Sequence, residues 1–336
     1  MRNSLVRLLI PLLVIAVFIV IAGYSYYSRA VTRQLSFPKD TFLIESGDTL
    51  NRIANRLVGE GILPEPWSLR LLAKRKGIGG SILAGEYQFP EKMNLQEFLD
   101  RVVNGKGQVD VRVTIVEGWT FQQMREALRQ APKLSQLTAE WSDQKIMGAL
   151  GYPELHPEGQ FYPDTFYYRA NDTDLELLKK SFGLMQTKLD HAWQQRAPDL
   201  PLEDPYEVLI LASIIEKETQ VREEQPTIAG VFMNRLKKGM RLQTDPTVIY
   251  GVGDAYDGDI TREHLKTDTP YNTYTRAGLT PTPISLPGED SLMAAVKPSK
   301  TEAFYFVAKG GGRHKFSKTL AEHNAAVRKY ILGKSK

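Results

Sequence analysis

The chain has 336 residues, of which 42% are apolar and 24% charged, with a net charge of +4; these values are typical of a folded protein of two or three domains. It contains no cysteine, which excludes a disulfide framework, thiolate zinc sites and a cysteine nucleophile. No lysine- and arginine-rich run is interleaved with aromatic residues, which argues against nucleic acid as a partner.

The first predicted element is a membrane anchor. Every residue from Leu8 to Ala22 is apolar, with Pro11 the only helix breaker, and the flanking residues bring the stretch close to the ~20 needed to span a bilayer. Arg2 and Arg7 precede it, which favours a cytoplasmic N-terminus and leaves the rest of the chain outside the cytoplasm. We therefore predict an uncleaved anchor over residues 1–28. A cleaved signal peptide is the alternative, but the apolar core is long for one and no clear cleavage site follows.

A polar linker is predicted over residues 29–39, followed by a small module over residues 40–150. The module opens with SGDTLNRIA, which indicates a turn and a helix with Thr49 as N-cap. These letters resemble the opening of LysM peptidoglycan-binding modules. A capped helix after a turn would explain the same residues without any binding.

Two echoes of this pattern follow. Aligning Gly47 with Gly118 also aligns Thr49 with Thr120, and MNLQEFLDRVVNG is a fainter third version. Strand–turn–helix units therefore recur over residues 40–130, which predicts a small α+β module and not a doubly wound sheet.

A second domain is predicted over residues 151–333. The aromatic stretch GQFYPDTFYY indicates either the edge of a core, which we favour, or a wall on which sugars stack. Asp204 and Pro205 predict the start of a helix that is apolar on almost all sides, as in a central buried helix. Next come an expected helix that stops at Gly239, a strand and turn in MRLQTDPTVIYGVG, a long loop, and a closing strand–turn–strand–helix.

Two glutamates end the apolar helix. On an ideal helix, Glu218 lies one turn beyond Ile214 and Ile215, while Glu216 lies about 160° away. A carboxyl over a bulky apolar stripe loses water, and this raises its pKa toward the value that a general acid needs. Glu218 is therefore the better candidate acid, and Glu216 suits a structural hydrogen bond. The alternative for Glu218 is a surface ion pair with Arg222.

Other catalytic chemistry finds little support in the sequence. Neither G-x-S-x-G nor H-E-x-x-H is present, and the S-x-x-K spacing of Ser142 and Lys145 lacks its companion elements. The five histidines show no metal-ligand spacing, so no metal site is predicted; they are His156, His191, His264, His314 and His323.

Several long stretches carry a family resemblance: EGQFYPDTFYY, ASIIEKET, VFMNRLKKGMRLQTDPTVIYG, YNTYTRAGLTPTPISLPG and FYFVAKGGGRHKFSKTLAEHN. Together, and in this order, they resemble the endolytic murein transglycosylases of the YceG-like family over about residues 5–330. The resemblance implies an α+β protein with an N-terminal transmembrane helix, a LysM-like subdomain, and a mixed α+β catalytic domain whose buried central helix carries the catalytic glutamate.

The resemblance also implies a function. The family cleaves peptidoglycan strands between MurNAc and GlcNAc in the periplasm while anchored in the inner membrane, which leaves 1,6-anhydroMurNAc ends and would end strand elongation. Its single catalytic acid is the second glutamate of the E-K-E word, Glu218 here, and its partners are penicillin-binding synthases. No cofactor is implied.

Motif and residue type predict the residues that line the substrate cleft: Gln243, Asp245, Tyr271, Asn272 and Tyr274. Where the family more often has glycine after the prolines of GLTPTPISLPG, this chain has Thr282, so the details of that loop are open. Two alternatives remain. One is a hydrolytic muramidase that uses Glu218 with Asp245 or Asp164, and the other is a non-catalytic wall-binding scaffold for synthases.

Overall fold

The computed structural model describes residues 2–37, 41–45, 47–78, 82–170 and 172–333. The chain divides into two compact units, each with its own hydrophobic core. The first unit comprises residues 1–111, 132–135 and 167–172, and the second comprises residues 112–131, 136–166 and 173–336. The predicted boundary at residue 150 does not match this division, because most of residues 112–150 pack within the second unit.

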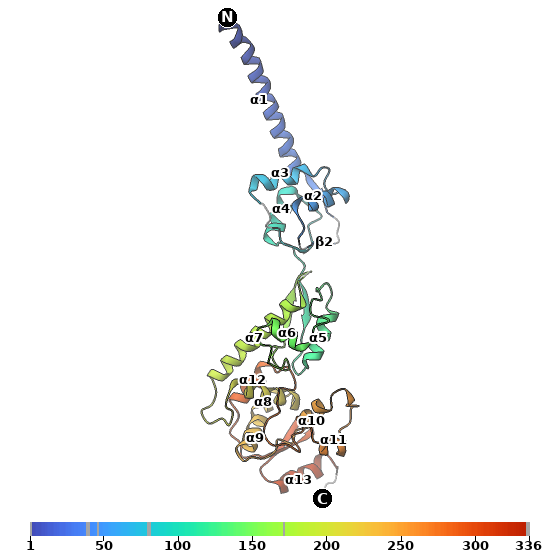
Figure 1. Cartoon of the computed structure of the whole chain (residues 1–336), viewed down its shortest axis with the longest axis vertical. Coiled ribbons are helices and arrows are strands. Elements are labelled where there is room, and N and C mark those ends of the chain that lie inside the picture. Colours follow the sequence, from blue (N-terminus) through green and yellow to red (C-terminus); the bar gives the residue numbers. More distant parts are fainter. Residues whose placement is uncertain (1, 38–40, 46, 79–81, 171, 334–336) are drawn as a thin grey trace. The chain divides into compact units, whose positions relative to one another are not determined.

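The first unit combines short antiparallel strand pairs with helices (Figure 1). Strand β1 pairs with β4, with Leu35 opposite Met93, and β2 pairs with β3, with Leu43 opposite Glu86. Its described elements are α1 (Arg2–Thr32), β1 (Gln34–Ser36), β2 (Phe42–Ile44), α2 (Leu50–Gly59), α3 (Trp67–Lys76), β3 (Gly85–Tyr87), β4 (Lys92–Asn94) and α4 (Leu95–Asn104).

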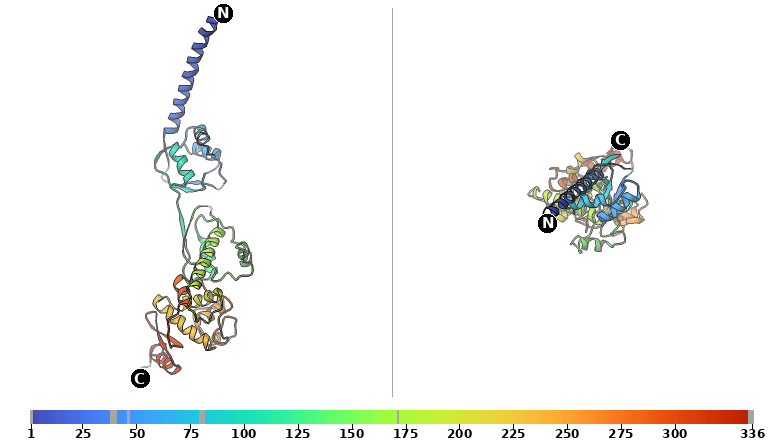
Figure 2. Two further views of the ribbon diagram at one scale, coloured as in Figure 1. Left: turned by 90° about the vertical axis from the view of Figure 1, so that its left-hand side faces the viewer. Right: turned by 90° about the horizontal axis from the view of Figure 1, so that it is seen from above.

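Helix α1 runs directly into the folded module, so the predicted linker over residues 29–39 is wrong where the structure describes it. The helix continues to Thr32, and only Arg33 separates it from β1. Val31, Leu35 and Phe37 are all buried in the core of the first unit. Figure 2 shows α1 leaving the module without an intervening loop. Lys39 and its two neighbours lie outside the described residues.

The second unit is mainly helical. Strand β7 pairs with β8, and β5 pairs with β6; one end of β5 (Val111) and one end of β6 (Tyr167 and Tyr168) belong to the first unit. Its described elements are β5 (Val111–Thr114), α5 (Phe121–Gln130), α6 (Asp143–Ala149), β6 (Thr165–Tyr168), α7 (Asp174–Gln194), α8 (Pro205–Glu218), η1 (Arg222–Glu224), α9 (Gln225–Lys237), α10 (Asp245–Val252), η2 (Gly253–Ala255), α11 (Arg262–Lys266), α12 (Glu289–Val296), β7 (Tyr305–Gly310), β8 (Arg313–Ser317) and α13 (Leu320–Tyr330).

Helix α8 forms the centre of the second unit, as the sequence predicts. The Asp204 side chain caps its start by accepting a hydrogen bond from the Glu207 N–H at 2.9 Å, and Pro205 occupies the first turn. All residues from Val208 to Ile215 are buried. Helices α7, α9, α10 and α12 contact α8, so its apolar surface is covered on several sides.

The aromatic stretch is part of the core, which decides between the two predictions made for it. Phe161, Tyr162, Phe166 and Tyr168 are buried, whereas Tyr167 is 58% exposed. The rings of Phe161 and Phe121 stack with their centroids 4.8 Å apart. Most of the stretch therefore cannot offer its rings to a sugar.

The strand–turn–helix repeats are present, but they do not form one module. Thr49 and Thr120 both cap helices, and Gly47 and Gly118 both adopt positive φ angles of 82° and 78°. The helix capped by Thr120 belongs to the second unit. The local pattern was therefore predicted correctly, while the grouping was wrong.

The strand predicted after Gly239 is also wrong, because Asp245–Val252 forms helix α10. Its β-branched residues favour a strand, but Pro246 sits in the first turn, where proline favours a helix start. Thr247 and Val248 are buried, and α10 contacts α8. Packing against the central helix outweighs the local strand propensity.

Candidate active site

Glu218 is the last residue of α8, where the helix stops because Thr219 is extended. The Thr244 hydroxyl donates a hydrogen bond to Glu218 Oε1. The side chain keeps some exposed surface, yet protein atoms enclose most of the carboxyl. The Glu218 carboxyl is therefore largely desolvated, yet part of the side chain remains accessible to a substrate.

Burial raises the pKa of the Glu218 carboxyl from 4.5 to about 7. The Asp245 carboxylate raises this pKa further, while the Thr244 hydroxyl bond and the Arg235 guanidinium lower it. Near neutral pH the carboxyl therefore exists in both its protonated and its ionised form. A group of this kind can donate a proton in one step and accept one in the next.

The alternative role for Glu218, an ion pair with Arg222, does not occur. Helix α8 ends before Arg222, which lies in η1. The Arg222 guanidinium instead pairs with Glu117 at 3.5 Å and Asp290 at 3.0 Å. These pairs are largely exposed and contribute little to stability.

Glu216 has the structural environment that the helical projection predicts. Its Oε2 accepts a hydrogen bond from the Gly288 N–H at 2.9 Å, just before the first turn of α12. Burial raises its pKa, and the Gly288 hydrogen bond opposes this shift. The carboxyl thus ties α8 to α12, away from the Thr244 contact of Glu218.

Arg235 of α9 is buried close enough to Glu218 for each charge to act on the pKa of the other. Its Nε donates to the Phe304 carbonyl at 2.6 Å and its Nη1 to the Leu242 carbonyl at 2.8 Å. The guanidinium therefore joins the chain before α10 to the chain before β7. It organises the surroundings of Glu218 and supplies a fixed positive charge.

Three of the five predicted cleft residues, Gln243, Asp245 and Tyr274, lie near Glu218, in the chain before α10, at the first residue of α10 and in the loop after α11. Tyr274 donates from its hydroxyl to Asp245 Oδ1 at 2.6 Å. The exposed Gln243 has a φ angle of +49°, in the left-handed region where residues other than glycine are strained. Its N–H donates to the Thr273 carbonyl at 3.1 Å, and such a held, strained residue is a candidate for substrate contact.

The other two predicted cleft residues are placed differently. Asn272 is 1% exposed, and its Nδ2 donates to the carbonyls of His264, Leu265 and Thr267, so it braces the loop and does not line a cleft. This corrects the prediction made for it from residue type. Tyr271 lines a different cavity, where its hydroxyl lies 2.9 Å from Thr282 Oγ1.

Glu218 opens onto a groove of about 460 Å³. One wall is the end of α8 and the residues after it, and the other is the turn of the β7–β8 hairpin. The lining residues are Glu218, Thr219, Gln220, Val221, Ala308, Gly311, Gly312 and His314.

His314 is fixed in this groove by a buried carboxylate. Its Nδ1 lies 2.9 Å from Glu224 Oε2, and its backbone N–H donates to the same oxygen at 3.0 Å. Both side chains are about 10% exposed. The sequence gives no local signal for this pair, because the residues are 90 positions apart and only the fold brings them together.

A second, larger cavity of about 1190 Å³ lies beside the site, lined chiefly by α5 and α10. Its lining includes Lys217, which precedes Glu218 in the chain, and Pro246, which follows Asp245. Glu158 faces it and accepts hydrogen bonds from the Phe121 N–H at 2.9 Å and the Tyr250 hydroxyl at 3.1 Å. Burial raises the pKa of Glu158 to about 7. Because its two hydrogen-bond partners belong to α5 and α10, we infer that Glu158 has a structural role in connecting these helices.

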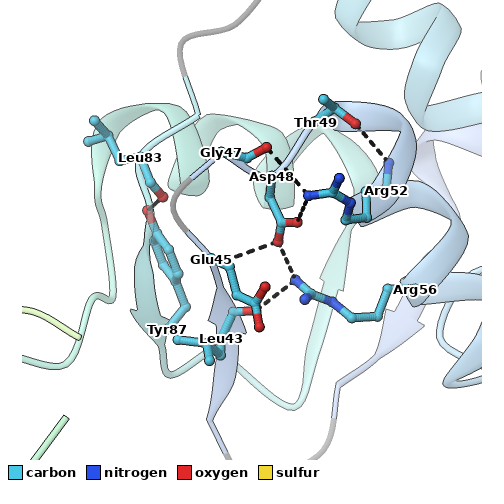
Figure 3. Close-up of polar contacts among 9 residues, drawn as sticks. All are labelled: Leu43, Glu45, Gly47, Asp48, Thr49, Arg52, Arg56, Leu83 and Tyr87. Carbon is cyan, nitrogen blue, oxygen red and sulfur yellow. Dashed lines mark hydrogen bonds and ion pairs between the residues drawn. The ribbon is translucent and has the colours of Figure 1, made fainter. Parts of the chain in front are cut away.

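The first unit contains its own polar cluster where SGDTLNRIA begins (Figure 3). The Asp48 carboxylate accepts from the Glu45 N–H at 3.1 Å and lies 3.2 Å from Arg52 and 3.3 Å from Arg56. Thr49 accepts from the Arg52 N–H at 3.3 Å, which confirms the predicted N-cap. The SGDTLNRIA stretch is thus explained locally by a turn, an N-cap and a carboxylate paired with two arginines.

The described residues hold no group of three or more histidine, aspartate or glutamate side chains that could bind a metal ion. One described helix is long and apolar enough to cross a membrane, with its span at Ile10–Thr32.

Comparison with known proteins gives consistent matches. Residues 42–329 match the model of the YceG-like family. An endolytic murein transglycosylase of Bacillus subtilis (strain 168) is 31% identical, covering 94% of this chain and 92% of that protein. One of Streptococcus pneumoniae serotype 2 is 25% identical over 87% of this chain and 58% of its own length.

A structural match agrees with these relatives. The crystal structure of a YceG-like protein from Listeria monocytogenes superposes with a TM-score of 0.56 at 28% identity, over 88% of this chain and 99% of that chain. The family model spans most of the chain, and the Bacillus relative matches almost end to end. The chain therefore belongs to the YceG-like family.

Proposed function

We propose that this protein is an endolytic murein transglycosylase and that Glu218 is its single acid–base catalyst. The observation that carries the proposal is the Glu218 carboxyl, which opens onto a groove and whose pKa burial raises to about 7. The relatives named endolytic murein transglycosylases support the substrate, peptidoglycan.

The proposed reaction needs only one carboxyl. Protonated Glu218 donates its proton to the glycosidic oxygen between MurNAc and GlcNAc, the bond from that oxygen to MurNAc C1 breaks, and GlcNAc leaves with a free hydroxyl. The Glu218 carboxylate then takes the proton of the MurNAc C6 hydroxyl, whose oxygen bonds to C1. The products are a GlcNAc end and a 1,6-anhydroMurNAc end, no water is consumed, and Glu218 is protonated again.

Neighbouring residues support this cycle. Thr244 orients the carboxyl, and Arg235 and Asp245 act on its charge with opposite signs. We assign Gln243, Asp245 and Tyr274 to contacts with the sugars. Tyr271 would contact parts of the strand that extend into the larger cavity, and the N-acetyl group of MurNAc can stabilise the charge that develops at C1.

A hydrolytic muramidase is the second candidate, because Asp245 lies close enough to raise the Glu218 pKa. Such an enzyme needs a second carboxylate to activate water or to bond C1. The exposed Asp164 accepts from the neighbouring Thr165 N–H, and no contact connects it with Glu218 in the described residues. Asp245 is therefore the remaining choice for that role.

Product analysis distinguishes the two reactions. Purified peptidoglycan is digested with the full-length protein, and the released fragments are weighed by mass spectrometry. The transglycosylase yields ends lighter by one water than hydrolytic ends. Mainly reducing ends, with activity lost in Asp245→Asn, would establish the muramidase instead. No cleavage by folded protein would favour a wall-binding scaffold.

The apolar span of α1 supports an uncleaved single-pass anchor in the inner membrane, with both units in the periplasm. There the first unit would hold glycan strands, and penicillin-binding synthases would supply nascent strands whose elongation the cut ends. A reporter fused after Lys336 that works only in the cytoplasm would contradict this orientation.

A further inference from the structure

Helix α3 packs against the end of α1 in the first unit (Figure 1). The Tyr26 ring of α1 stacks on Trp67 at the start of α3, with centroids 5.5 Å apart. Arg75, in the last turn of α3, lies 5.0 Å from the centre of the Tyr27 ring. Both ends of α3 therefore contact the same turn of the anchor.

These contacts place α3 at the level of the lipid headgroups. A hydrocarbon core ~30 Å thick is crossed by about 20 helical residues. A span of that length counted from Leu8 ends at Tyr27, and one counted from Ile10 ends at Arg29. Tyrosine and tryptophan side chains are enriched at the interface between hydrocarbon and water, and the stacked pair Tyr26–Trp67 fits that position. If α1 spans a bilayer, α3 therefore lies beside the bilayer surface, because it packs directly on the last turns of α1.

The exposed face of α3 has the composition of an interfacial helix. Its buried face consists of Ser68, Leu69, Leu72 and Ala73. The opposite face carries a tryptophan, an exposed leucine and three cations, and the helix contains no acidic residue; these residues are Trp67, Arg70, Leu71, Lys74 and Arg75. Leu71 is 40% exposed and lies between Arg70 and Lys74 on this face, so an apolar side chain is flanked by cations, as in helices that lie in a membrane interface.

The cations on this face are not neutralised by carboxylates within the described residues. Arg70 donates to the neutral Asn55 side chain at 2.8 Å, Arg75 faces the Tyr27 ring, and Lys74 makes no ion pair or hydrogen bond through its side chain there. Only Lys76, on another side of the helix, pairs with an acid, Asp100, at 2.7 Å. The face therefore keeps its positive charge.

We propose that α3 is a membrane-surface binding helix whose Arg70, Lys74 and Arg75 contact the phosphates of anionic phospholipids while Trp67 and Leu71 enter the interface. The proposal rests on the anchor assigned above. Each cation near an anionic surface increases lipid association roughly fivefold at moderate salt. The helix would thereby fix how the first unit faces the bilayer.

A depth probe tests the proposal on the full-length protein in lipid nanodiscs. Because the chain contains no cysteine, Leu71→Cys and Leu43→Cys each carry one fluorophore. The two leucines are matched, since both are 40% exposed, and Leu43 lies in β2. Lipids spin-labelled at the headgroup should quench the Leu71 probe more when phosphatidylglycerol replaces part of the phosphatidylcholine. The Leu43 probe should not respond.

Charge variants assign the effect to α3. Lys74→Gln with Arg75→Gln should reduce the docked-to-undocked ratio of the Leu71 probe roughly 25-fold, since two cations are lost, and Arg75→Lys should leave the ratio unchanged. Lys92→Gln with Lys106→Gln removes the same charge from exposed positions elsewhere in the first unit and should have no effect. Raising the salt concentration should weaken quenching in the unmodified protein.

Equal quenching of Leu71 with and without phosphatidylglycerol would overturn the proposal, as would equal effects of the two double variants. A probe at Val17→Cys, quenched by labels deep in the acyl chains, separates this failure from failure of the anchor. If Val17 is quenched and Leu71 is not, α1 is inserted and α3 does not bind lipid. If neither is quenched, the anchor itself is wrong.

Discussion

The start of α2 and the end of α8 each hold a carboxylate with little exposure, but in opposite settings. Asp48 precedes the first turn of α2, where the helix dipole is positive, and two guanidinium groups lie within 3.3 Å of it. Glu218 is the last residue of α8, where the dipole is negative, and its one direct hydrogen-bond partner among the described residues is the Thr244 hydroxyl.

The difference separates a carboxylate that holds structure from one that can react. Asp48 has its negative charge balanced by the guanidinium groups of Arg52 and Arg56. Glu218 has its charge opposed by burial and by Asp245, so gaining a proton is favourable near neutral pH. The same side-chain chemistry therefore serves two purposes according to its partners.

Replacing the reactive carboxyl should have the largest effect. Glu218→Gln keeps the shape but cannot transfer the proton, and loss of general acid–base catalysis costs about 10²–10⁴-fold in rate. Because one group serves both steps, we expect the upper end of this range. The rate of anhydroMurNAc release from purified peptidoglycan measures it.

Glu216→Gln is the matched control two residues away. The Gly288 N–H can donate to an amide oxygen as well, so this variant should remain active and folded. If Glu216→Gln fails while Glu218→Gln works, the assignment of the two glutamates is reversed.

The pH dependence should sharpen the contrast further. Because the proposed reaction begins with protonated Glu218, whose pKa is about 7, the rate should fall about tenfold per unit above that pH. Asp245→Asn removes a charge that raises this pKa, so the alkaline fall should begin at lower pH. A rate that stays level well above pH 7 would exclude Glu218 as the acid.

The same pKa predicts a pH effect on stability. Glu218 and Glu158 bind protons more tightly in the folded chain than in the unfolded chain, where carboxyl pKa values are near 4.5. Stability should therefore fall as pH rises from about 4.5 to 7. Chemical unfolding of wild type, Glu218→Gln and Glu158→Gln should show a weaker fall in each variant.

A smaller effect is expected at the groove wall. Glu224→Gln replaces the carboxylate beside His314 Nδ1 and should free the ring, with a loss of about tenfold in kcat/KM. His314→Asn keeps a polar side chain and should retain more activity than His314→Ala. Equal activity of all three variants and wild type would show that the His314 wall of the groove does not contribute to the site.

The smallest effect on catalysis is expected at Asp48, in the first unit. Asp48→Asn should weaken the bridge to Arg52 and Arg56 and cost about 1–2 kcal/mol of first-unit stability. Because Arg52 is mostly exposed, the cost stays below that of a fully buried pair. Hydrogen exchange of α2 measures it, and cleavage of short soluble strands should not change.

Sequence reasoning identifies features that depend on neighbouring residues. Two predicted helices are present, and both follow from spacing and caps: the helix capped by Thr49, and the buried helix that begins at the Asp204 cap and ends at Glu218. Asn272 was misjudged because residue type does not reveal whether an amide is already bonded. Helix α10 was missed because its packing on α8 depends on the fold.

The partners of Glu218 show the same limit. Thr244 and Asp245 lie 26 and 27 positions beyond it, and nothing in the local pattern selects Thr244 over its neighbours. The pairing of Glu224 with His314 across 90 positions has no local signal at all. Glu218 could be singled out from the sequence as the candidate acid, whereas the groups that tune its pKa and enclose it required the tertiary structure.

The join between α1 and β1 has a mechanical consequence. A single residue, Arg33, separates the two elements, and Val31 and Leu35 on either side are buried in one core. A chain with a flexible tether would absorb a pull by extending at ~3.5 Å per residue. Here tension between α1 and the first unit acts on the hydrophobic core of that unit at once, because no slack chain separates them.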